Sequence, residues 1–121
     1  MKPQDNRYYW VLEPFLNEPS LILKSMFGCS ACYLHGKLVL VLADDKDPWK
    51  GLLVPTEKKF QPELIREIPA LKPHSVLGKW LYLSADGDDF EELSMKITEM
   101  ITRLDPRIGV EPKEKAKKGK R

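Results

Sequence analysis

The chain has 121 residues, of which 42% are hydrophobic and 31% are charged, and its net charge is +2. This composition is typical of one ordinary globular domain, and two cysteines are too few for a disulfide framework. No apolar run approaches the roughly 20 residues that cross a bilayer, and residues 1–6 are too polar for a signal peptide. We therefore expect a cytoplasmic protein that is not associated with a membrane.

The charges are distributed unevenly along the chain. Residues 111–121 carry six Lys or Arg and two Glu, whereas residues 1–110 carry 14 basic and 16 acidic side chains. The body is therefore mildly acidic, and the last segment is basic and low in complexity. We predict one domain over residues 1–110 and a basic disordered tail over residues 111–121.

The first expected element is a short amphipathic helix over residues 5–16, because its apolar residues recur at helical spacing. Asp5 or Asn6 would cap its start. Pro14 forfeits a backbone hydrogen bond and crowds the preceding turn, so it is expected near the end of the helix or at a kink.

Residues 25–57 form the most strongly patterned stretch and predict a three-stranded antiparallel meander. Side chains alternate over residues 26–34, which is typical of a strand. Residues 37–43 are nearly all Leu and Val, and this predicts a strand in the middle of the sheet that is covered on both faces. Between these two strands, His35 and Gly36 fit a two-residue hairpin turn.

A third strand is predicted over residues 51–54 and ends at Pro55. Because proline removes a hydrogen-bond donor from the ladder, this strand is expected at or near the sheet edge. A helix over residues 60–68, a loop over residues 70–77 and a strand over residues 79–84 are expected next.

The last expected helix begins near Asp88, which would cap it with Glu91 at the spacing of a capping box. Pro106 is expected to stop it. Its buried face would consist of apolar residues at 3-4 spacing, namely Phe90, Leu93, Ile97, Met100, Ile101 and Leu104. The expected fold is α+β, with an antiparallel sheet, helices packed on one face and the order α-β-β-β-α-β-α.

Three short motifs accompany this order: Met26-Phe27-Gly28, the turn Tyr33-Leu34-His35-Gly36-Lys37, and Leu42-Ala43-Asp44. Together they resemble the N-terminal domain of TfoX/Sxy proteins, the bacterial competence regulators, over roughly residues 5 to 105. The resemblance implies a two-layer fold related to secretion-chaperone-like architecture and no enzymatic activity. It also implies structural motif positions at Met26, Phe27, Gly28, Gly36 and Asp44. Cys29 departs from the family pattern, which usually has a second glycine there, and the chain ends without the separate C-terminal domain of the full-length regulators.

Cys29 and Cys32 form a C-x-x-C motif, which is typical of thiol-redox pairs and of half a zinc site. In an extended strand, their side chains would point to opposite faces and their Cα atoms would lie about 10 Å apart, beyond the ~7 Å limit for a disulfide. His35 and His74 would be the only further zinc ligands. We therefore interpret both cysteines as packing residues and keep redox and zinc sites as alternatives.

Other side chains suggest chemistry but have structural explanations. An acidic cluster near the last helix would bind a cation, yet it lacks the spacing of a calcium loop and suits the first turn of a helix. The cluster consists of Asp86, Asp88, Asp89, Glu91 and Glu92. Trp49 lies in the loop after the second strand, where it either covers the sheet or anchors a partner, and we favour burial.

The basic tail is the candidate nucleic-acid contact. Its cations would bind phosphates without reading sequence, because the tail has no aromatic residue to stack on bases. They are Lys113, Lys115, Lys117, Lys118, Lys120 and Arg121.

The preferred hypothesis is a non-enzymatic cytoplasmic binding or regulatory module that acts through protein contacts with an unidentified partner, a homodimer being one form of such contact. The alternatives are a nucleic-acid-associated protein that uses its tail for weak, non-specific binding, and a thiol-redox or zinc protein. No cofactor, metal ligand or catalytic residue is expected.

Overall fold

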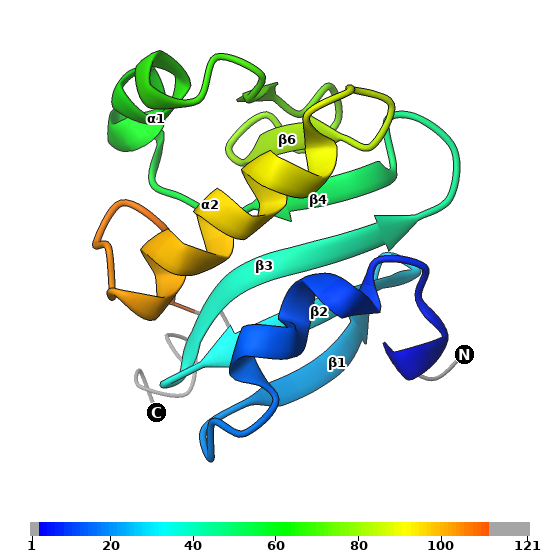
Figure 1. Cartoon of the computed structure of the whole chain (residues 1–121). Helices are drawn as coiled ribbons and strands as arrows, with labels where there is room; N and C mark the ends of the chain where they lie inside the picture. The colour runs from blue at the N-terminus through cyan, green and yellow to red at the C-terminus, as the bar shows by residue number, and fades with distance from the viewer. Residues whose placement is uncertain (1–2, 112–121) are drawn as a thin grey trace, which may run out of the picture.

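The computed structural model describes residues 3–111 and has an α+β fold (Figure 1). Within this range, one antiparallel sheet has six strands in the order β1-β2-β3-β4-β6-β5. The strands are β1 (Ile22–Met26), β2 (Cys29–Leu34), β3 (Lys37–Asp44), β4 (Lys50–Val54), β5 (Lys72–Pro73) and β6 (Leu81–Ser84). The α-helices are α1 (Gln61–Glu67) and α2 (Phe90–Thr102), and the 3₁₀ helices are η1 (Pro3–Asp5), η2 (Tyr9–Phe15) and η3 (Lys58–Phe60). No helix in residues 3–111 is long and apolar enough to span a membrane.

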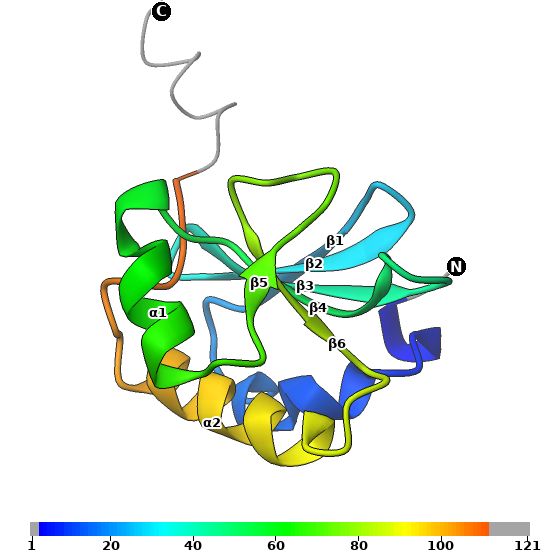
Figure 2. The same ribbon diagram turned by 90° about the horizontal axis from the view of Figure 1, so that it is seen from above.

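The main core lies between one face of the sheet and the helices. α2 and η2 cover this face, and α1 lies at one end of the sheet (Figure 2). The apolar stripe of α2 packs inward as its spacing predicts, and β2, β3, β4 and β6 supply the facing side chains. Fully buried members of this core include Leu12, Leu40, Leu42, Leu52, Leu64, Leu81, Ile97 and Met100.

The opposite face of the sheet is covered by loops and strand ends, and we name it the loop-covered face. Val41, Leu53 and Tyr82 are buried there in a second, smaller apolar cluster. The loop before β6 lies over this face (Figure 2). Its Trp80 and Leu77 belong to the same cluster. β3 is therefore buried on both faces, which confirms its predicted central position.

The predicted three-stranded meander is wrong in one respect, because the chain turns within the strand predicted over residues 26–34: β1 ends at Met26 and β2 begins at Cys29. The chain reverses at Phe27 and Gly28, whose φ angles are 55° and 75°, so that Met26 pairs with Cys29 across a two-residue hairpin. Phenylalanine is not a typical turn residue, and this concealed the hairpin. The order of elements consequently includes an additional edge strand, β1.

The predicted edge position of the strand before Pro55 is also wrong. β4 lies between β3 and β6, and the edges of the sheet are β1 and the short β5. Pro55 follows the last paired residue of β4 and therefore removes no donor from the ladder. β5 falls in the predicted loop 70–77, and Pro73 occupies an edge strand, where proline is tolerated.

The helices differ from expectation at their ends. The first is the 3₁₀ helix η2 with Pro14 inside it, and Asn6 Oδ1 accepts a hydrogen bond from Tyr8 N–H just before it. α2 begins at Phe90 without a side-chain cap, so the predicted capping box of Asp88 is wrong. Leu104 lies beyond the end of α2, is 69% exposed and has a φ of 60°, so its predicted burial is wrong as well.

Candidate functional site

Phe27 breaks two rules of the local fold. It occupies the first position of a hairpin turn in which both residues have left-handed backbone, where Asn-Gly is the preferred sequence. The left-handed conformation costs an L-residue about 1–2 kcal/mol. Its ring is nevertheless 63% exposed and has one aromatic neighbour, Trp49, at a centroid distance of 6.3 Å. The chain therefore holds a bulky aromatic ring in solvent at an energetic cost.

A groove of about 610 Å³ lies beside Phe27. The β1–β2 hairpin lines it together with the segment after β4, the loop before β6 and the end of the described chain. We name it the groove, and its lining residues are Lys24, Ser25, Met26, Phe27, Tyr33, Leu38, Thr56, Glu57, Lys58, Lys79, Trp80, Val110 and Glu111. Trp80 and Leu38 belong to the second apolar cluster, so the groove opens on the loop-covered face.

Three lysines from separate segments line the groove. Lys24 Nζ lies 5.4 Å from the centroid of the Tyr33 ring, and Lys79 Nζ lies 5.3 Å from that of Trp80. In residues 3–111, Lys24 and Lys58 have no carboxylate within ion-pair distance. The groove thus combines cations with aromatic rings on a body that is otherwise mildly acidic.

The end of the described chain is paired with the sheet at the groove. Val110 N–H donates a hydrogen bond to Leu38 O at 3.0 Å, and Leu38 N–H donates to Val110 O at 2.9 Å. Gly109 N–H donates to Pro55 O at 2.7 Å. Glu111 therefore reaches the rim of the groove, and the chain continues from there into residues 112–121.

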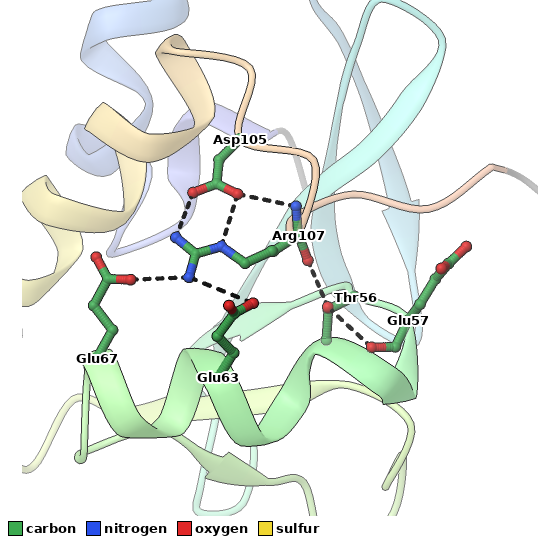
Figure 3. Close-up of polar contacts among 6 residues, drawn as sticks. All are labelled: Thr56, Glu57, Glu63, Glu67, Asp105 and Arg107. Atoms are coloured by element: carbon green, nitrogen blue, oxygen red, sulfur yellow. Dashed lines mark hydrogen bonds and ion pairs between the residues drawn. The ribbon is translucent and has the colours of Figure 1, made fainter.

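Arg107 fixes this last segment to α1 (Figure 3). Its Nε and Nη2 donate to the two carboxylate oxygens of Asp105 at 2.9 and 2.6 Å, and its Nη1 lies 3.0 Å from Glu67 Oε1. Thr56 Oγ1 donates to the Arg107 carbonyl at 2.5 Å. Hydrogen bonds from Arg107 hold the pKa of Asp105 below its ordinary value. These contacts of Arg107 hold the segment after α2 against α1 and against Thr56.

A second hollow of about 390 Å³ lies between the end of η2, the β2–β3 hairpin and the segment after α2. Its walls are largely apolar and include Phe15, Ile101 and the exposed Leu104. His35 and Lys37 lie on its lining, and His35 Nδ1 is 3.4 Å from Ser20 Oγ. It shares no lining residue with the groove.

His74 is buried, with 2% exposure, and both of its ring nitrogens are in use. Nδ1 accepts hydrogen bonds from Val76 N–H and Leu77 N–H at 3.1 and 2.9 Å, which places the proton on Nε2. Nε2 donates to Pro48 O at 2.6 Å. The half-buried Trp49 packs on this ring at 4.4 Å, so His74 joins two loops and has a structural role.

The two cysteines lie on opposite faces of β2. Cys29 belongs to the cluster of the loop-covered face and Cys32 to the main core, and both are free thiols. Burial raises the pKa of Cys29 and raises the pKa of Cys32 to about 12. In residues 3–111, no three His, Cys, Asp or Glu side chains are grouped to hold a metal. The redox and zinc alternatives gain no support from this arrangement.

We expect the thiols to resist alkylation in the native protein. At pH 8 the thiolate fraction of Cys32 is about 10⁻⁴, roughly a thousandfold below that of a free cysteine. Iodoacetamide labelling followed by intact mass should show almost no adduct on Cys32 in buffer and two adducts per chain in guanidinium chloride. Fast labelling of Cys32 in buffer would contradict its burial.

The remaining predicted positions are dispersed. Gly36 has a φ of 81° in the β2–β3 turn, and Asp44 ends β3 and accepts a hydrogen bond from Arg7 N–H at 2.8 Å. In the acidic cluster, Asp86 pairs with Lys50 at 2.7 Å. Of the family motif residues, Met26 and Phe27 line the groove. The tail cations lie outside the described residues; they are Lys113, Lys115, Lys117, Lys118, Lys120 and Arg121.

The groove could not be recognised from the sequence as a site. Its three lysines belong to no motif in the sequence, and the sheet and its loops bring them to one groove. They are Lys24, Lys58 and Lys79. The signal that was available is Gly28, because glycine inside an alternating pattern often marks a turn or bulge.

No protein-family model matches the chain, and comparison with curated proteins and with solved structures also gives no match.

Proposed function

We propose that the protein is a non-enzymatic cytoplasmic binding module and that the groove is its binding surface. The observation that carries this proposal is Phe27, an exposed aromatic side chain at a left-handed turn position. A residue that strains the backbone with little packing in return is expected where it serves a contact outside the chain. Leu104 has similar exposure and the same backbone conformation, but it has no aromatic ring and lies at the second hollow, so Phe27 is the residue that connects this strain to the groove. Aromatic side chains are also enriched among the residues that dominate binding energy at interfaces.

The resemblance to the TfoX N-terminal domain supports contact with a protein. A homodimer through the free edge of β1 is one form of such contact, because β1 is an edge strand and its Ile22 is exposed. A second candidate function is association with nucleic acid. It is supported by the three lysines of the groove and by the position of Glu111, where the chain continues into the basic residues.

The proposal is tested by comparing Phe27→Asn with Leu104→Asn. Both residues are exposed and left-handed, and asparagine tolerates that conformation, so both variants should be as stable as the wild type or more stable by up to about 1 kcal/mol. Of these two residues, Phe27 lines the groove and Leu104 does not. Affinity capture with the tagged chain should recover partners with wild type and Leu104→Asn and lose them with Phe27→Asn.

Nuclease treatment of the captured material decides between the two classes of partner. Partners that resist nuclease are bound as proteins, whereas partners released by nuclease are held through nucleic acid. Identical recovery by all three chains, with thermal unfolding showing all of them folded, would refute the groove as the binding surface.

A further inference from the structure

We infer that the groove binds single-stranded nucleic acid, with its lysines on the phosphates and Phe27 stacked on a base. This inference rests on the proposed function, because it assigns a ligand class to the same groove. Its support comes from the charge of the groove, its aromatic surface and the position of the end of the described chain.

The charge of the groove favours a polyanion. Lys24, Lys58 and Lys79 line it from β1, η3 and the loop before β6. The two acids of the groove are Glu57 and Glu111, and Lys59 Nζ lies 3.5 Å from the Glu57 carboxylate and so partly neutralises it. Cations placed along a groove neutralise successive phosphates and release counterions, which gives affinity without sequence specificity.

The aromatic surface favours unpaired bases over a duplex. Proteins that bind single strands combine a positive groove with side chains on which bases stack. The ring of Phe27 is exposed at the groove, and Tyr33 lies half-buried in its lining beneath Lys24. In a duplex the base faces are already stacked on one another, so Phe27 would have no base to stack on.

The basic segment begins where the groove ends. Val110 and Glu111 line the groove, and the ten residues 112–121 contain six Lys or Arg. The tail by itself lacks aromatic residues, and the groove supplies them.

The test is fluorescence anisotropy of labelled oligothymidylate of about 15 nucleotides, a length within the range of single-strand sites. A duplex of equal length and an equally labelled oligoglutamate peptide are titrated in parallel with the full chain. We expect the single strand to bind most tightly. Phe27→Asn should weaken its binding about tenfold, whereas Leu104→Asn should leave it unchanged.

Charge variants test the phosphate contacts. The slope of log affinity against log salt should become shallower by up to about 4 units in a chain that ends at Glu111. In Lys58→Gln it should become shallower by about 0.7. Glu57→Gln should raise the affinity, because it removes an acid from the groove. An anionic ligand makes Lys58→Gln weaken binding and Glu57→Gln strengthen it, whereas a cationic ligand would reverse both effects.

The inference would be overturned if the duplex bound as tightly as the single strand, or if oligoglutamate bound more tightly than the single strand. Equal affinities of Phe27→Asn and Leu104→Asn for the single strand would overturn it too, as would the absence of binding to any of the three probes. If affinity capture still shows nuclease-resistant partners that depend on Phe27, the groove remains the binding surface and only its ligand class is wrong. If capture also shows no dependence on Phe27, the proposed function fails as well.

Discussion

Replacing Gly51 with alanine is expected to cost about 4 kcal/mol of folding free energy, a large part of the about 5–15 kcal/mol that a typical domain has. Gly51 lies in β4 opposite Ser84 of β6 with a φ of 142°. A Cβ atom there would overlap the carbonyl oxygen of Leu83 and lie 2.9 Å from the amide nitrogen of Ala85. Both are backbone atoms of the neighbouring strand and its exit, so they cannot move away without separating β4 from β6.

Urea unfolding followed by tryptophan fluorescence measures this effect, with Gly87→Ala as the matched control. The nearest atom to a Cβ on Gly87 is Ser84 O at 3.8 Å, and its backbone is not left-handed, so the control should change stability by less than about 1 kcal/mol. Equal losses in the two variants would show that the close approach at Gly51 is not the cause.

Arg107→Met is expected to cost about 2–3 kcal/mol at neutral pH, because hydrogen bonds to charged groups contribute about that much and their partners stay behind. In the variant, the mostly buried carboxylate of Asp105 would lose the Arg107 guanidinium that pairs with it. Glu67, which pairs with the same guanidinium, would lose its partner as well (Figure 3). The methionine retains most of the apolar stem, so the loss reports the polar contacts. Arg66→Met is the control, since Arg66 is exposed on the same helix, α1, that Arg107 contacts.

The cost of Arg107→Met should depend on pH. Arg107 lowers the pKa of Asp105 in the folded state below its unfolded value, which is near 4. The pair therefore contributes its full stability above the unfolded pKa, and this contribution is lost as the pH falls through the folded pKa. The difference between wild type and variant should be full at pH 7 and shrink below about pH 4. A difference that stays constant down to pH 3 would exclude Asp105 as the group responsible.

The elements predicted correctly from the sequence are those whose own residues carry the full pattern of a strand or helix. The Leu and Val run of β3 and the 3-4 stripe of α2 indicate burial by themselves. The position of β4 was missed because its second neighbour, β6, is far away in sequence, as the pairing of Val54 with Leu81 shows. Pro55 indicates where the strand stops but not what lies beside it.

The candidate site was harder to predict for the same reason. The C-x-x-C motif stands out locally, yet alternation along β2 sends its two sulfurs into different clusters. The Nδ1 partners of His74 are backbone amides two and three residues away, but the acceptor of its Nε2 proton, the Pro48 carbonyl, lies 26 residues before it and has no sequence signal. The lysines of the groove carry no local signal, and Phe27 occupies a turn position that sequence preference assigns to other residues.

The placement of α2 after all six strands has a consequence for folding on the ribosome. β1 to β4 are complete at Val54, but the helix that covers their apolar face ends only at Thr102. At a translation rate of about 5–20 residues per second, several seconds pass between the synthesis of β4 and the completion of α2. The nascent chain is therefore most exposed to aggregation in this interval, and a ribosome that stalls in residues 55–90 would leave a fragment whose sheet has η2 but not α2 on its apolar face.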